Sequence, residues 1–198
     1  ALEVAQLREE HAKAKSTKKE TSMYDIPQSE LLQMAESCEL RWDTPGIGGR
    51  EPAYKSDDFA KLEISDGEGE LVNRHVVKTR ARLLDEVRRT YTAVTGDENT
   101  GSLAGEAMFA EINDKTTGDE LKRIFQVLAR ERAGLQVKPP EGAPMPPVER
   151  MFRVITGAGD QLEQEIAAEI GPDAARKTRD LYKGWGDRHR SSHGCPGQ

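Results

Sequence analysis

The chain of 198 residues has a formal net charge of −6, with 35% apolar and 32% charged residues. This length allows one domain with an appended arm, and the low apolar fraction predicts a small core that leaves part of the chain outside it. The acidic balance argues against a general nucleic-acid binder, which needs an excess of basic residues, and no stretch approaches the ~18 apolar residues of a membrane span.

Residues 1–20 are mostly polar and charged, and we interpret them as a helical arm or stalk outside a single helical domain at 21–198. Two alternatives stay open for this arm: a solvated terminus, or a stalk through which two copies form a dimer. The chain begins at Ala1 without a methionine. A removed signal peptide and a membrane tether upstream of Ala1 therefore also stay open.

After the arm, a short helix is predicted at about 28–39, with Cys38 on its apolar face. Glycine and proline residues then recur through 43–67, which predicts a long loop with one short turn near Phe59. Loops of this length in compact domains are usually functional or loosely ordered.

The strongest helical pattern runs from Glu68 to Thr95, where apolar residues recur at spacings of three, four and seven, and Gly96 stands at the C-cap position. Two shorter helices follow, and then a proline-rich connector over 138–147. A second long helix is predicted from about Pro147 to Ile170, and a final one from about Asp173 to Lys183.

These elements predict an all-α fold of five or six helices, with two long antiparallel helices and shorter ones packed across them. We find no strand pattern of useful length. The apolar stripes predict a core in which eight residues are buried together: Val76, Leu83, Val87, Phe125, Leu128, Phe152, Ile155 and Leu162.

The sequence of Val154–Gly159 is similar to that of a strand leading into a dinucleotide-binding turn. The fingerprint needs a third glycine three residues later, and Leu162 occupies that position. The same residues fit the helical stripe of 147–170 without a break. We therefore interpret Gly157 and Gly159 as sites of close helix packing or of a kink.

The two cysteines, Cys38 and Cys195, lie near opposite ends of the chain. A tail ending in Gly-Cys-Pro-Gly cannot pack much of itself, so we expect its thiol to have a partner. We predict a disulfide between Cys38 and Cys195, and with it an oxidising compartment.

The alternative for the tail is a metal site made by His189, His193 and Cys195, because imidazole nitrogen and thiolate sulfur are good ligands for zinc or copper. The spacing matches no familiar zinc motif, and a thiolate ligand cannot also form the disulfide. We favour the disulfide with two solvated histidines. The basic residues around Trp185 are interpreted as the solvated face of a last helix, with Trp185 docked on the core.

No catalytic motif survives inspection, so we expect no catalytic residue and no cofactor. The leading hypothesis is a non-catalytic periplasmic or extracellular protein that binds another macromolecule, with a protein as the candidate partner, either chaperone-like or as a sensor ectodomain. The alternative is a metal-binding protein that uses the tail cluster. A third hypothesis, ranked well below these, is an enzyme whose site is assembled from scattered residues.

Overall fold

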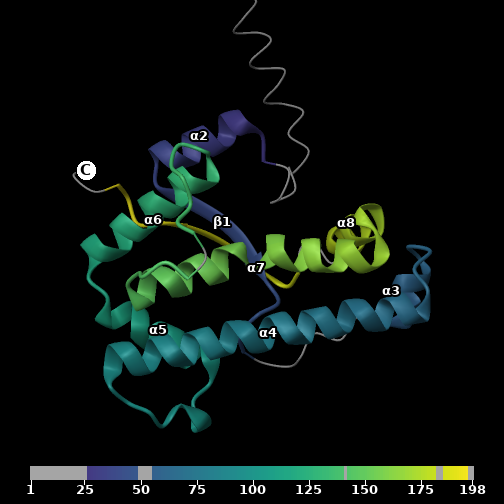
Figure 1. Cartoon of the computed structure of the whole chain (residues 1–198), viewed down its shortest axis with the longest axis horizontal. Helices are drawn as coiled ribbons and strands as arrows, with labels where there is room; N and C mark the ends of the chain where they lie inside the picture. Colours follow the sequence, from purple (N-terminus) through teal and green to yellow (C-terminus); the bar gives the residue numbers. More distant parts are fainter. Residues whose placement is uncertain (1–25, 49–54, 141, 182–184, 196–198) are drawn as a thin grey trace, which may run out of the picture.

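The computed structural model describes residues 26–48, 55–140, 142–181 and 185–195, and these are mostly helical, as the sequence predicts (Figure 1). The predicted arm at 1–20 lies outside the described residues. Among those described, the α-helices are α2 (Gln28–Glu36), α3 (Ser56–Ala60), α4 (Asp66–Thr95), α5 (Gly105–Lys115), α6 (Gly118–Arg132), α7 (Pro147–Ile170) and α8 (Pro172–Leu181). One turn of 3-10 helix, η1 (Thr100–Ser102), precedes α5.

Helix α4 is the longest element, and local sequence signals set both of its ends. Ser65 and Glu68 form a capping box, in which the Glu68 amide donates to Ser65 Oγ and the Ser65 amide donates to Glu68 Oε2 at 2.8 Å. Gly96 ends the helix in the left-handed region at φ 77°, a conformation that costs glycine little. The helix starts two residues earlier than the periodicity predicts.

Helix α7 runs without interruption through Gly157 and Gly159, so residues 154–159 are helical and form no dinucleotide-binding turn. Pro147 occupies the first helical position, where its missing N–H is not needed. A Cβ placed at Gly157 would meet no atom within 4 Å. The prediction of close packing is therefore wrong at this glycine.

Helices α4 and α7 pack against each other, and Figure 1 shows them side by side. At one end of the pair, Arg150 Nε lies 2.6 Å from Glu86 Oε1. Toward the other end, Glu165 Oε2 lies 3.3 Å from His75 Nδ1. These polar contacts join the margins of two helices whose apolar faces are buried.

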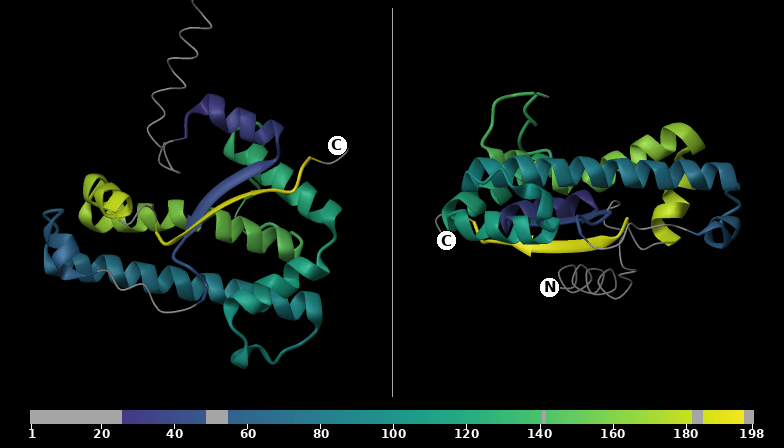
Figure 2. Two further views of the ribbon diagram at one scale, coloured as in Figure 1. Left: turned by 180° about the vertical axis from the view of Figure 1, so that it is seen from behind. Right: turned by 90° about the horizontal axis from the view of Figure 1, so that it is seen from below.

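The structure contains a two-stranded antiparallel sheet, which the sequence analysis failed to predict. Strand β1 (Glu39–Thr44) pairs with β2 (Asp187–Ser192), with Glu39 opposite Ser192 and Trp42 opposite His189. Figure 2 shows the two strands crossing α7, and in its right-hand view β2 lies along the lower side of the helices. The sheet thus fixes the C-terminal segment to the start of the domain.

The predicted loop at 43–67 is shorter in the structure than in the sequence interpretation. Asp43 and Thr44 belong to β1, α4 already begins at Asp66, and α3 lies between them. Phe59, at the predicted turn, is in α3 and is buried. Residues 49–54 of this segment lie outside the described ranges.

All eight predicted core residues are buried, but they belong to two hydrophobic clusters rather than one. The larger cluster lies among α4, α5, α6, α7 and β1 and contains six of them. Val76 and Leu162 belong to the second cluster, together with Phe59, Ile64, Val72, Ile166, Ala175 and Trp185. The second cluster joins the first half of α4 to the second half of α7.

In the described part of the chain, no helix combines the length and the apolar character needed to cross a bilayer.

Candidate functional site

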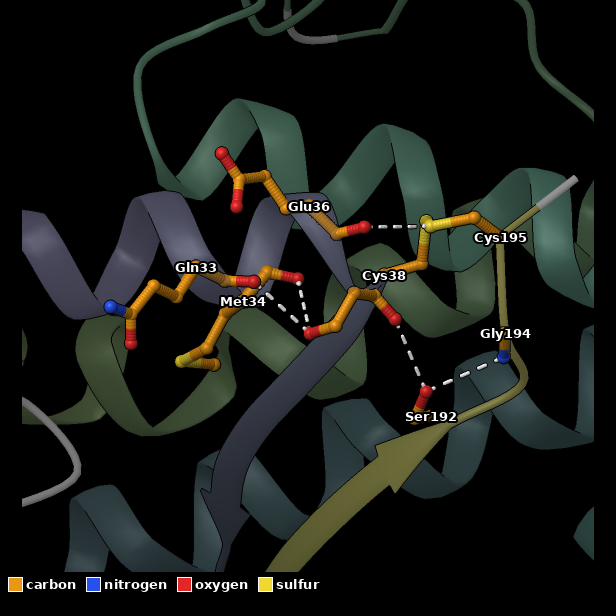
Figure 3. Close-up of a disulfide and its surroundings, with 8 residues drawn as sticks. Gln33, Met34, Glu36, Cys38, Ser192, Gly194 and Cys195 are labelled. Atoms are coloured by element: carbon orange, nitrogen blue, oxygen red, sulfur yellow. Dashed lines mark hydrogen bonds between the residues drawn. A yellow bond between two sulfur atoms is a disulfide. The ribbon is translucent and has the colours of Figure 1, made fainter. Parts of the chain in front are cut away.

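Cys38 and Cys195 form a disulfide, as predicted from the sequence, with their Cα atoms 5.3 Å apart (Figure 3). Cys38 lies beyond α2, which ends at Glu36 rather than at the predicted residue 39, and its φ of 52° turns the chain from the helix cap at Ser37 into β1. Both cysteines are buried. The bridge therefore closes a loop with a sequence separation of 157 residues and is shielded from solvent.

Hydrogen bonds hold the tail next to the disulfide. Ser192 Oγ donates to the Ser37 carbonyl oxygen at 3.2 Å and accepts from the Gly194 amide at 3.4 Å (Figure 3). Cys195 Sγ lies 3.2 Å from the Glu36 carbonyl oxygen. The end of β2 is thus attached to the end of α2 by a covalent bond and by hydrogen bonds.

The two tail histidines each contact a different aromatic ring. The His189 imidazole stacks on Trp42 with ring centroids 5.2 Å apart and planes at 19°. The His193 imidazole meets Phe125 edge-on, with centroids 4.4 Å apart. His193 is exposed overall, and partial burial of its ring beside Phe125 lowers its pKa below the ordinary value of 6.5.

The structure does not assemble His189, His193 and Cys195 as a ligand set. The sulfur of Cys195 is bonded to Cys38, and each histidine is placed on an aromatic side chain. Within the described ranges, no three His, Cys, Asp or Glu side chains are grouped so as to hold a metal ion. Metal binding by the tail stays an untested prediction without a structural observation in its favour.

The segment that leads into β2 is anchored by Trp185, as predicted. The Trp185 indole is fully buried in the second cluster, and the backbone amide of Trp185 donates to Asp43 Oδ2 at 3.1 Å. Of the neighbouring basic residues, Arg176, Lys177 and Arg190 are exposed, as predicted, whereas Arg179 is buried and pairs with Glu163 at 2.8 Å. The basic tail is therefore partly engaged in ion pairs within the fold.

A cavity of about 140 Å³ lies beside the sheet, between β1, β2, α5 and α7. Its lining is mainly apolar and aromatic, with three polar side chains: the residues are Trp42, Thr44, Ile47, Glu106, Phe109, Ile155 and His189. Apolar walls with a few polar groups are the usual composition of a ligand pocket. Among the described cavities, this one has the strongest features of a binding site.

Sequence reasoning missed this cavity, although it considered several of its residues separately. His189 is exposed, as the sequence interpretation predicts, but the β1–β2 pairing also places it opposite Trp42, which was not predicted. No local sequence signal reveals that pairing, because the partners are about 150 residues apart. A second, more polar cavity lies between α6 and α7 and is lined by Glu131, Arg132 and Arg153 among others.

None of the protein-family models, curated proteins or solved structures compared with this chain matches it.

Proposed function

We propose that the chain is a non-catalytic, disulfide-bonded helical protein of the cell envelope or of secretions, and that it binds another protein. The binding element is the connector between α6 and α7, of which the structure describes 133–140 and 142–146. The long helices α4 and α7 serve as its antiparallel frame. The observation that carries the proposal is the exposure of two apolar side chains on this connector, Leu135 at 48% and Val137 at 90%.

The disulfide supports the proposed location. Disulfides persist in oxidising compartments and are rare where glutathione and thioredoxin keep thiols reduced. Cys38 and Cys195 are both buried, so a reductant reaches the disulfide only after the tail opens. This geometry is typical of a structural bridge rather than of a transient redox pair.

The exposed side chains support the binding surface. Most large apolar side chains in the described part of the chain are buried, and Val137 is the most exposed of those that are not. Exposed apolar side chains that lie close together are a common feature of interaction sites. Figure 2 (right) shows the connector standing out from the helices on the side away from β2.

Hydrogen bonds hold the described parts of the connector, which favours binding. The Leu135 amide donates to the Arg130 carbonyl oxygen at 2.8 Å, and the Ala143 amide donates to Pro140 O at 3.1 Å. Prolines fix the backbone φ over much of the rest. A segment that is already ordered loses less conformational entropy on binding, so more of the contact energy appears as affinity.

Site-specific photo-crosslinking in the native compartment tests the proposal. The photoreactive residue replaces Val137 in one variant and Val77 in a control, because Val77 is an exposed apolar residue of α4. We expect one protein to be crosslinked at 137 and not at 77. That protein, identified and purified, is expected to bind wild-type chain in solution.

The Val137→Asp variant is expected to weaken this interaction at least about tenfold, which corresponds to ~1.4 kcal/mol, while Val77→Asp leaves it unchanged. Thiol alkylation before lysis checks the compartment in the same cells, and we expect Cys38 and Cys195 to be protected. Equal crosslinking at both positions, or equal effects of the two substitutions, would contradict the binding role. Free thiols in the cell would contradict the location.

A further inference from the structure

The cavity beside the sheet has a rigid aromatic wall. Trp42 is held between the stacked His189 ring and an edge contact with Phe125, whose centroid is 6.2 Å away. Phe109 meets Phe152 edge-on at 5.8 Å. Because both rings of the wall are fixed by their neighbours, the cavity is formed before any ligand arrives. Its volume of about 140 Å³ is close to the ~150 Å³ of an engineered apolar cavity that binds benzene.

One carboxylate, that of the exposed residue Glu106, belongs to the lining of this cavity. Glu106, in the first turn of α5, lines the cavity and has no ion-pair partner among the residues that the structure describes. The other polar groups of the lining are the Thr44 hydroxyl and the His189 imidazole. The one acidic side chain therefore makes the cavity complementary to a cation.

The backbone next to the cavity positions this carboxylate. A Cβ at Gly48 would lie within 1.5–1.7 Å of the carboxyl atoms of Glu106, so the carboxylate occupies the space that a side chain at 48 would need. The Gly48 carbonyl oxygen accepts a hydrogen bond from Arg80 Nη2 at 2.8 Å, which fixes the backbone there. Gly105 permits the close approach, because a Cβ at that position would lie 2.3 Å from the Ile47 carbonyl oxygen.

We propose that this cavity binds a small organic ammonium ion with an apolar body about the size of a benzene ring. The rings of Trp42 and Phe109 pack against the body, and Glu106 pairs with the ammonium group. Aromatic faces and a carboxylate together are the groups that recognise organic cations in proteins. This inference does not depend on the proposed protein-binding function, because it concerns other residues on other elements.

Three probes of similar size and different charge test the charge selectivity: benzylammonium, benzyl alcohol and benzoate, added to the purified oxidised chain at pH 8. Titration calorimetry gives the affinities, and NMR shifts of the Trp42 indole N–H locate the site. We expect saturable one-to-one binding of benzylammonium with a Kd on the order of a millimolar. We expect binding about tenfold weaker for benzyl alcohol and none for benzoate.

Variants distinguish the contribution of the carboxylate to binding from that of the apolar walls. Glu106→Gln is expected to weaken benzylammonium binding about tenfold and to leave benzyl alcohol binding unchanged. Gly48→Ala keeps the carboxylate but displaces it, and we expect it to weaken benzylammonium binding as well. Glu98→Gln removes an exposed carboxylate outside the cavity lining and is the matched control, with no expected effect. Three outcomes would overturn the proposal. They are equal affinity for all three probes, no effect of Glu106→Gln, and binding that leaves the NMR shift of the Trp42 indole N–H unchanged.

Discussion

Gly69 and Gly157 both lie inside long helices, but their surroundings are opposite. A Cβ at Gly69 would lie 2.5 Å from Phe59 Cδ2, whereas a Cβ at Gly157 would meet open space. Glycine in a helix interior costs about 0.5–1 kcal/mol relative to alanine, because its backbone loses more freedom on folding. The structural role of each glycine is therefore decided by what faces it.

We expect Gly157→Ala to raise the free energy of unfolding by about 0.5–1 kcal/mol. Gly69→Ala is expected to lower it, because the new methyl group forces the buried Phe59 ring to move. Urea denaturation of both variants against the wild type measures the two effects. A destabilised Gly157→Ala variant would show that something packs against α7 at this position.

His193 gives the tail a pH-dependent contribution to stability. Burial lowers its pKa in the folded chain below the ordinary value of 6.5, so the folded state binds fewer protons than the unfolded state as the pH falls. Its protonation therefore opposes folding. The contribution of His193 to stability becomes less favourable below pH 6.5 and recovers as the pH rises through the folded pKa toward that value.

The His193→Gln variant, which cannot titrate at this position, tests the sign. We expect the difference in unfolding free energy, wild type minus variant, to increase between about pH 5 and pH 7. Denaturation curves at several pH values in one buffer series provide the measurement. A difference that stays constant, or that falls over this range, would show that the imidazole is solvated in the folded chain.

At the scale of elements, the sequence predicts the long helices well and the sheet not at all. The helix pattern over 68–95 is dense, because Val72, Val76, Leu83 and Val87 repeat on one face and all are buried. Strand β1, in contrast, has the sequence Glu-Leu-Arg-Trp-Asp-Thr, and β2 is entirely polar. Two short strands acquire their conformation from pairing with each other, and that pairing is invisible to a local pattern.

The candidate site depends on this unpredicted pairing. Its residues come from β1, the segment just after β1, α5, α7 and β2, and each is ordinary in its own segment. The cysteines were the one long-range signal in the sequence, and the disulfide they predict is confirmed. That link brings the right segments together, but it does not specify their register. A register that places Trp42 opposite His189 was therefore beyond sequence reasoning.

The helical core makes a direct prediction for two side chains. Leu83 on α4 and Phe125 on α6 are both fully buried in the larger cluster. Truncating either to alanine is expected to lower the free energy of unfolding by about 2–5 kcal/mol, from lost burial and the cavity left behind. Val77→Ala, at an exposed position of α4, is the control and is expected to change stability little. Equal stability of all three variants would show that burying Leu83 and Phe125 contributes little to the stability of the fold.

At the scale of the whole molecule, two hydrophobic clusters share the frame of α4 and α7, and the C-terminal segment connects them. Trp185 is buried in the second cluster, while β2 pairs with β1 beside the first. Cys195 then fixes the end of β2 to the end of α2. The last part of the chain is thus attached at one point by packing and at another by a covalent bond.

Replacing both cysteines, Cys38→Ser with Cys195→Ser, should therefore affect the two attachments differently. The bridge closes a loop with a sequence separation of 157 residues, and loop entropy gives such a bridge about 3–5 kcal/mol. We expect a loss of stability up to that size, measured by urea denaturation. We also expect faster amide hydrogen exchange over 189–195 in the variant, whereas the Trp185 amide stays protected because its hydrogen bond to Asp43 and the buried indole remain. Unchanged exchange over 189–195 would mean that strand pairing alone holds the tail, and exposure of Trp185 would mean that the second cluster depends on the bridge.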